Sequence, residues 1–167
     1  VDIIKYLAEK HPELLNTLDQ HGCTPAHTAA IHNQVGALDA LHDIKPDLNL
    51  IGEKMKNGYT AAHFAAIFGH DAVLKQIHEI NPTLLQAKTK KGNNPAHSAA
   101  ERGHDYVLTT VLKQIAPDLL TEKNQNKKTP LDLLEKNKTT PHRRPPSRYG
   151  QKGPKFGGTT PGAEAGR

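Results

Sequence analysis

The sequence predicts an all-α solenoid in which helix–turn–helix units stack one behind another. A Gly-x-x-x-Ala-His hexapeptide occurs at residues 22–27, 58–63 and 92–97, and an eroded fourth copy occupies 127–132. The last residues of these copies are 36, 34 and 35 positions apart, and self-similarity at such a period is typical of stacked repeats. A similar period separates four prolines, Pro12, Pro46, Pro82 and Pro117.

Each hexapeptide predicts the start of a first helix. Its third residue can cap the free amides of a helix, and a proline after the cap lacks only an amide that a helix start leaves unpaired. The glycine suits a turn with positive φ. The Ala-Ala pairs that follow let neighbouring first helices approach closely. The residues expected to hold the fold in this way are Thr24, Pro25, His27, Thr60, His63, Asn94, Pro95, His97, Thr129 and Pro130.

An apolar stripe at helical spacing predicts a second helix in each unit, most clearly at residues 73–80 and 107–115. We interpret these stripes as core between units rather than as a cofactor box. The distance from Pro46 to Gly58 is twelve residues, against ten at the corresponding place in the other units. This difference predicts a two-residue insertion at the second finger, around residues 51–53.

The chain resembles the ankyrin-repeat family, whose signature is a turn, Thr-Pro-Leu-His-x-Ala and two helices in about 33 residues. The resemblance rests on the hexapeptides, the Ala-Ala pairs, Gly69-His70 and Gly103-His104, and it covers residues 1–137. It implies β-turn or hairpin fingers between units. Val1 falls midway through a unit, so we expect the chain to be cut from a longer protein. The implied units are a partial repeat at 1–18, repeats at about 19–54, 55–88 and 89–123, and a capping partial repeat at 124–137.

The charge distribution predicts a disordered basic tail at residues 138–167. Residues 1–138 carry sixteen basic and sixteen acidic side chains, whereas residues 139–167 carry a net charge of +5. The tail is rich in Pro and Gly and nearly free of aliphatic residues, so it cannot bury enough surface to fold. Within the repeats, residues 1–85 are net −4 and residues 86–138 net +4. The positive end is interpreted either as solvated fingers or as a surface for a partner with an acidic patch.

The histidines and the single cysteine predict no enzyme, no metal site and no cofactor. His27, His63 and His97 recur once per unit, which indicates a structural hydrogen-bonding role, and the other histidines lack zinc-ligand spacing. Cys23 has no base visible in the sequence and occupies a position that varies between units, so it is interpreted as a surface site. A single cysteine fits a reducing compartment, and no apolar run reaches membrane-spanning length. We therefore expect a cytoplasmic protein.

The resemblance implies a non-catalytic module that binds another protein or peptide across its concave face and finger tips, as a monomer. Similar repeats occur in eukaryotic scaffolds and in proteins that intracellular bacteria deliver into the host cytosol. Tyr59, Ile67 and Phe68 are interpreted either as exposed anchors or, for Ile67 and Phe68, as partly core. The alternative function is attachment of the basic tail to nucleic acid or an anionic membrane. The expected partner-binding residues are Gln20, His21, Cys23, Ile31, His32, Lys56, Asn57, Tyr59, Ile67, Phe68, Lys90, Lys91, Asn93, Glu101 and Arg102.

Overall fold

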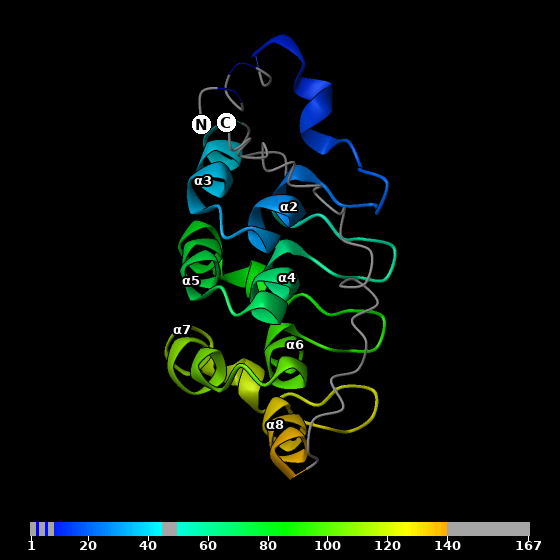
Figure 1. Ribbon diagram of the computed structural model, residues 1–167, viewed down its shortest axis with the longest axis vertical. Helices are drawn as coiled ribbons and strands as arrows, with labels where there is room; N and C mark the ends of the chain where they lie inside the picture. Colours follow the sequence, from blue (N-terminus) through cyan, green and yellow to red (C-terminus); the bar gives the residue numbers. More distant parts are fainter. Residues whose placement is uncertain (1–2, 4–5, 7–8, 45–49, 140–167) are drawn as a thin grey trace, which may run out of the picture.

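The first helices of the units form one column. A computed structural model describes residues 3, 6, 9–44 and 50–139, which contain helices and turns but no strand. Within the column each helix packs against the next one along the chain (Figure 1). The prediction of a helical fold is therefore confirmed for the described residues. The column consists of α2 (Pro25–Ile31), α4 (Ala61–Phe68), α6 (Pro95–Arg102) and α8 (Pro130–Thr139).

A second layer of helices lies on one side of this column, and the loops that connect the units project from the other side (Figure 1). In the second layer α3 packs against α5, and α5 packs against the next helical segment. The layer consists of α3 (Val35–Ile44), α5 (Asp71–Ile80), the π-helical segment η3 (Val107–Leu112) and α7 (Lys113–Ile115). Three short 3-10 helices each begin at a proline. They are η1 (Pro12–Asn16), which precedes the first finger, η2 (Pro82–Gln86), which follows α5, and η4 (Pro117–Leu120), which follows α7.

Most of the predicted tail lies outside the described residues. Its first two residues, Lys138 and Thr139, are the last residues of α8, so the predicted boundary at 137 was two residues early. Lys138 is fixed by an ion pair of 2.8 Å with Asp105. This ion pair connects the last turn of α8 to the preceding unit.

The repeated histidine joins its unit to the next one at His63 and His97, whereas the buried Nε2 of His27 has no hydrogen-bond partner among the described residues. His63 Nδ1 accepts a hydrogen bond from the backbone N–H of Thr60 at 3.3 Å, which caps the start of α4. Since Nδ1 is an acceptor, the proton is on Nε2, which donates to the carbonyl of Asn93 at 2.9 Å. His97 repeats both contacts one unit later, with Asn94 N–H at 3.3 Å and the carbonyl of Lys128 at 2.9 Å. These histidines thus have the structural role that their recurrence predicted.

The eroded fourth copy keeps the cap without the histidine. Asp132 stands in the histidine place and accepts from the backbone N–H of Thr129 at 2.9 Å, while its own N–H donates to Thr129 Oγ1 at 3.2 Å. This reciprocal pair is a capping box. The backbone hydrogen bond of Thr129 lowers the pKa of the Asp132 carboxyl. The predicted roles of Thr129 and Pro130 at the start of the last helix are therefore confirmed.

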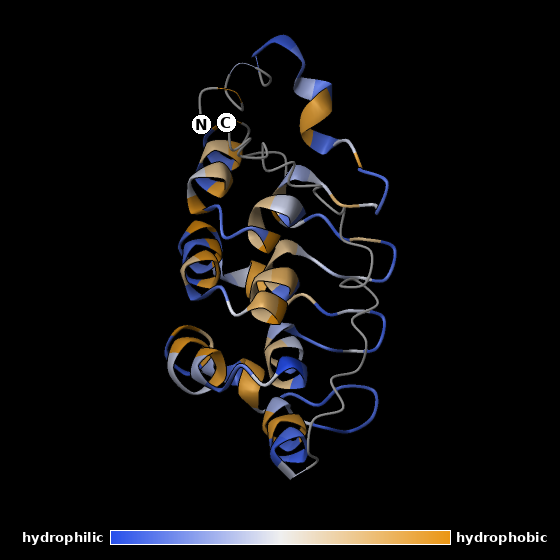
Figure 2. Ribbon diagram, in the orientation of Figure 1, coloured by the Kyte–Doolittle hydropathy of each residue, from blue (hydrophilic) through white to orange (hydrophobic). Residues whose placement is uncertain are grey.

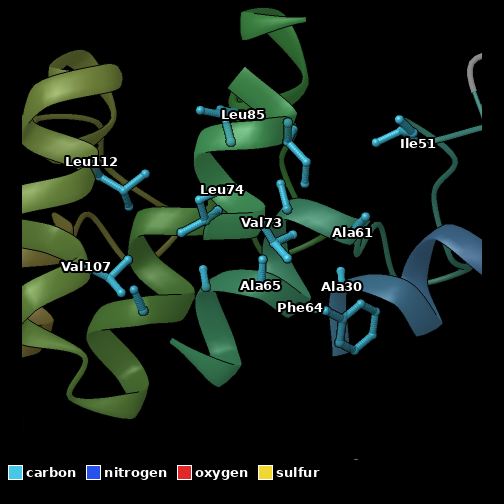
Figure 3. Close-up of a cluster of buried hydrophobic side chains, with 14 of the residues drawn as sticks. Ala30, Ile51, Ala61, Phe64, Ala65, Val73, Leu74, Leu85, Val107 and Leu112 are labelled. Carbon is cyan, nitrogen blue, oxygen red and sulfur yellow. The ribbon is translucent and has the colours of Figure 1, made fainter. Parts of the chain in front are cut away.

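The core lies between the two layers and continues from unit to unit. Ala30, Ala65 and Ala99 are buried where neighbouring first helices meet, so the helices approach closely at these small residues. Figure 3 shows Phe64 beside Ala30, with Val73, Leu74 and Leu85 on the side of the second layer. Phe64 is buried, and its ring lies edge-on to that of His27 with centroids 5.6 Å apart. The apolar stripes are thus core, as predicted.

Between its glycine and its proline the third unit has one residue more than the other units, and the π-helical segment η3 accommodates this residue. Gly58 and Pro82 are 24 residues apart, as are Gly22 and Pro46, whereas Gly92 and Pro117 are 25 apart. In η3 the N–H of Lys113 donates to the carbonyl of Leu108, five residues back. A π-bulge adds one residue without rotating the rest of the helix. The apolar residues before and after it therefore stay buried: Val107, Leu108, Val111 and Leu112.

The two-residue insertion of the second unit lies before its finger and not in it. Met55 to Tyr59 form a turn of the same length as the turns in the other units. The extra residues fall between Pro46 and Met55, a stretch that includes residues outside the described part. Within it Leu50 and Ile51 are buried against the core. The sequence therefore predicted the insertion in the right connection, which includes residues 51–53, but was wrong to place it at the finger, because the turn keeps the length that it has in the other units.

Candidate functional site

Four turns of equal length form the fingers on one side of the column. In each finger the first N–H donates to the carbonyl four residues later, at 2.8 to 3.0 Å. We name these turns finger 1 (residues 19–23), finger 2 (55–59), finger 3 (89–93) and finger 4 (124–128). Fingers 1 to 3 hold a glycine with positive φ, and Lys127 takes that place in finger 4 with φ 58°. The predicted turns are present, whereas no strand of a hairpin flanks them in the described residues.

Fingers 2, 3 and 4 are bonded to one another through their backbones. The N–H of Lys90 donates to the carbonyl of Asn57 at 3.0 Å, and the N–H of Gln125 donates to the carbonyl of Lys91 at 3.1 Å. Asn124 adds a side-chain contact, since its Nδ2 donates to Asn93 Oδ1 at 2.8 Å. The three fingers therefore form one continuous ridge with a fixed backbone.

The C-terminal ends of the first helices are also tied across units. His70 Nε2 donates to the carbonyl of Ile31 at 3.0 Å, and His104 Nε2 donates to the carbonyl of Ile67 at 2.7 Å. These bonds satisfy carbonyls that a helix end leaves without an intrahelical partner. Equivalent positions at these ends form a row of exposed side chains, which we call the helix-end row: His32, Phe68, Arg102 and Asn137.

The predicted partner-binding residues divide into three groups by exposure. The exposed group lies on finger tips and helix ends and contains Gln20, His21, His32, Lys56, Phe68, Lys90, Lys91, Glu101 and Arg102. The half-buried group contains Ile31, Asn57, Tyr59 and Ile67. The buried group contains Cys23 and Asn93.

The interpretation of Cys23 and Asn93 as surface residues was wrong. Only 7% of Cys23 and 4% of Asn93 is exposed. Asn93 Nδ2 donates to Glu101 Oε1 at 3.0 Å while its Oδ1 accepts from Asn124, so this side chain connects a finger to α6 and to the next finger. Burial, with a smaller effect of Asp19, raises the pKa of the Cys23 thiol. Asn93 therefore serves the fold at the base of finger 3, and Cys23 is buried at the base of finger 1.

Of the three apolar residues in the middle unit, only Phe68 is exposed. Its side chain is 43% accessible and its ring stacks on that of His70, with centroids 6.0 Å apart. Tyr59 packs against the rings of His63 and Phe64, and Ile67 packs against the core. The sequence left two interpretations open, exposed anchor or partly buried core residue. Phe68 is exposed, as the first requires, and Ile67 is partly buried, as the second requires.

Lysines dominate the ridge of fingers 2 to 4, and part of this set was missing from the predicted partner-binding residues. Fingers 2 to 4 and the residues beside them (53–59, 87–93 and 121–128) hold eight lysines and only two acids, Glu53 and Glu122. The second-layer segments 35–44, 71–80 and 105–115 are net −3. Figure 2 shows the finger loops as mostly hydrophilic, with short apolar stretches. Aligning the fingers by their glycines would have revealed this set; the lysines that were missed are Lys54, Lys88, Lys123, Lys127 and Lys128.

A cavity of about 390 Å³ opens against α2 at the N-terminal end of the stack. Leu18, Cys23, Pro25 and Ala29 form part of its wall. Among the described residues no first helix packs on this side of α2, so the cavity is the uncovered end of the column. The described residues as a whole contain no cluster of three or more His, Cys, Asp or Glu side chains placed to hold a metal ion. They also contain no helix with the length and apolar character needed to cross a membrane.

The chain was also compared with known proteins. A scan against protein-family models and a search of curated proteins both gave no match for the chain.

Proposed function

We propose that the chain is a non-catalytic protein-interaction module built from ankyrin-like repeats. Support for the repeats comes from three features that recur with the predicted period: the capped first helices, the histidines that bond to the following finger, and the glycines with positive φ. A stacked repeat of this kind presents an extended surface made of equivalent positions. Such a surface suits recognition of another protein.

The observation that carries the proposal is Phe68. An aromatic side chain that is 43% accessible lies in the helix-end row, between the exposed His32 and Arg102 of neighbouring units. Its backbone is held in place because the adjacent carbonyl of Ile67 accepts the hydrogen bond from His104. Aromatic and arginine side chains on a rigid surface are the groups that most often dominate binding energy. A fixed anchor also loses little conformational freedom when a partner binds.

The test is affinity capture with the full chain and two single variants. Phe68→Asp places a charge where the anchor would enter the partner, and we expect it to lose the captured protein. Tyr106→Asp is the matched control, since Tyr106 is a 60% exposed aromatic residue of the second layer. It should capture the same protein as the parent. Both positions are exposed, so circular dichroism and the urea midpoint should change little.

Retention of the partner by Phe68→Asp would contradict the proposed place of the site. Equal loss in both variants would indicate a general effect of the added charge and would also count against the anchor.

A further inference from the structure

The charge of the repeats is separated across the stack rather than only along it. The three finger segments carry a net charge of +6, while the second-layer segments carry −3. Along the chain the same charges gave only a gradient from −4 to +4. Surfaces of soluble proteins ordinarily intersperse both signs. A ridge of one sign therefore requires a separate explanation.

The lysines repeat in equivalent places on the ridge. Lys54, Lys88 and Lys123 each directly precede their finger, and other lysines occupy the finger tips. All eight lysine side chains of the ridge are exposed. Of these, Lys88 alone has an ion pair given by the structure, with Glu122 at 3.4 Å. The remaining charges face water together, on fingers whose backbones are bonded into one unit.

We propose that this lysine ridge binds an extended acidic segment of the partner protein, an inference that rests on the proposed function and deepens it. Neighbouring packed helices lie about 8–10 Å apart, and the fingers follow the same spacing because each belongs to one first helix. A chain in the extended polyproline II conformation has three residues per turn and advances about 3.1 Å per residue. Acidic residues at every third position would therefore lie on one face, about 9 Å apart, and face successive fingers.

Features of the ridge favour a polypeptide over a nucleic acid. Single-stranded nucleic acids bind to surfaces that combine positive charge with exposed aromatic rings. Tyr59 is the aromatic residue of fingers 2 to 4, and its ring is packed against His63 and Phe64. The three fingers also hold no arginine, the side chain whose planar fork fits phosphate best. Exposed apolar groups in the same units as the fingers, such as Phe68 and Leu131, suit apolar residues of a peptide.

The probe is a fluorescein-labelled peptide of about twelve residues with glutamate at every third position and Pro or Ser between, which favours the polyproline II conformation. A second peptide has glutamine in place of each glutamate, and a third probe is a labelled oligothymidine of equal length. Each probe is titrated by fluorescence anisotropy against the full chain, once at about 50 mM and once at about 300 mM salt. At the higher concentration the electrostatic screening length is severalfold shorter than the ridge, so charge-driven binding weakens.

Two double variants distinguish the ridge from the rest of the surface. Lys90→Gln with Lys127→Gln removes two charges from the tips of fingers 3 and 4. Lys75→Gln with Lys113→Gln removes the same charge from the second layer. Exposed ion pairs contribute about 0.2–1 kcal/mol each, so we expect the finger variant to weaken binding of the glutamate peptide roughly two- to thirtyfold. The control variant should change it less than twofold, and the glutamine peptide should not bind.

Three results would overturn the inference. Equal affinity of the parent and both variants would place binding elsewhere, for example on the basic residues of the tail, which are the same in all proteins. Tighter binding of the oligothymidine, lost in the finger variant, would make the ridge a nucleic-acid surface. Absence of saturable binding at low salt would leave the ridge as solvated charge. In each case the outcome for Phe68→Asp stands separately, so the proposed function can survive the loss of the acidic partner.

Discussion

Acidification should destabilise this fold through its buried histidines, and His63 gives the largest effect. Burial is the main cause that lowers the pKa of His63 from 6.5 to about 4; the charges of Lys54, His27 and His97 lower it further, and the hydrogen bond to the Asn93 carbonyl opposes them. A protonated ring would lose its role as acceptor for the N–H of Thr60. The cap of α4 would be lost with it.

The sign of the effect follows from the lowered pKa. The folded state favours the neutral ring, so its contribution to stability is complete above the unfolded pKa of about 6.5 and is lost as the pH falls towards the folded value of about 4. At about 1.4 kcal/mol for each pH unit, the difference corresponds to roughly 3 kcal/mol. That is a large fraction of the stability of a typical domain. Burial also lowers the pKa of His27 and His97, which adds in the same direction.

The assay compares the parent with His63→Gln by urea unfolding between pH 7.5 and 4.5. Glutamine at this position can still reach back to the N-cap N–H, but it does not titrate and loses the contact with Asn93. We expect the variant to be less stable at pH 7.5 and to lose about 2–3 kcal/mol less than the parent on acidification. Parallel pH profiles for the two proteins would refute the reasoning, because all other titrating groups are common to both.

Two further predictions concern the backbone. Gly58→Ala should cost about 3 kcal/mol or more in urea unfolding, because φ is 85° and a Cβ would lie 2.8 Å from the Cα of Thr89. Gly22→Ala should cost only about 1–2 kcal/mol for its φ of 77°, since its nearest neighbour is a flexible side-chain end at 3.8 Å; equal costs would contradict the close stacking of fingers. Deleting Thr110 should turn η3 into an α-helix and change the free energy of unfolding by less than about 1 kcal/mol. Deleting Lys75 from α5, which has no extra residue, should cost about 3 kcal/mol or more, because the deletion rotates apolar residues out of the core. A deletion of Thr110 as damaging as that of Lys75 would refute the account of the π-bulge.

The spacing of capping residues could be interpreted correctly from the sequence because capping is a local interaction. Thr60 and His63 are three positions apart, so a helix start brings them together whatever surrounds them. The same holds for Thr129 and Asp132 in the eroded copy. The helical stripes of the second layer are local in the same sense, since the helix period alone decides which residues share a face.

The exposure of the site residues could not be predicted in this way. Cys23, Tyr59, Asn93 and Lys128 occupy the same place in their fingers, and the sequence treats them as equivalent surface positions. In the structure Cys23 and Asn93 are buried, Tyr59 is half-buried and Lys128 is exposed. Asn93 is buried with a contact to Asn124, 31 residues later in the chain. The repeat pattern predicts the place of a residue within its unit. Its exposure depends on neighbours from other units, which the pattern does not give.

The amino-acid sequence alone was enough to predict the helical class, the period of the units, the caps that begin their first helices and the turns that hold a glycine. These features depend on residues within a few positions of one another, where backbone geometry and hydrogen bonding leave little choice. The packing of the units, by contrast, exposes Phe68 while Ile67 packs inward, keeps the third stripe in register through a π-bulge, and bonds the lysine-bearing fingers into one ridge. These depend on burial and on charge in space, which are set when units more than thirty residues apart pack together.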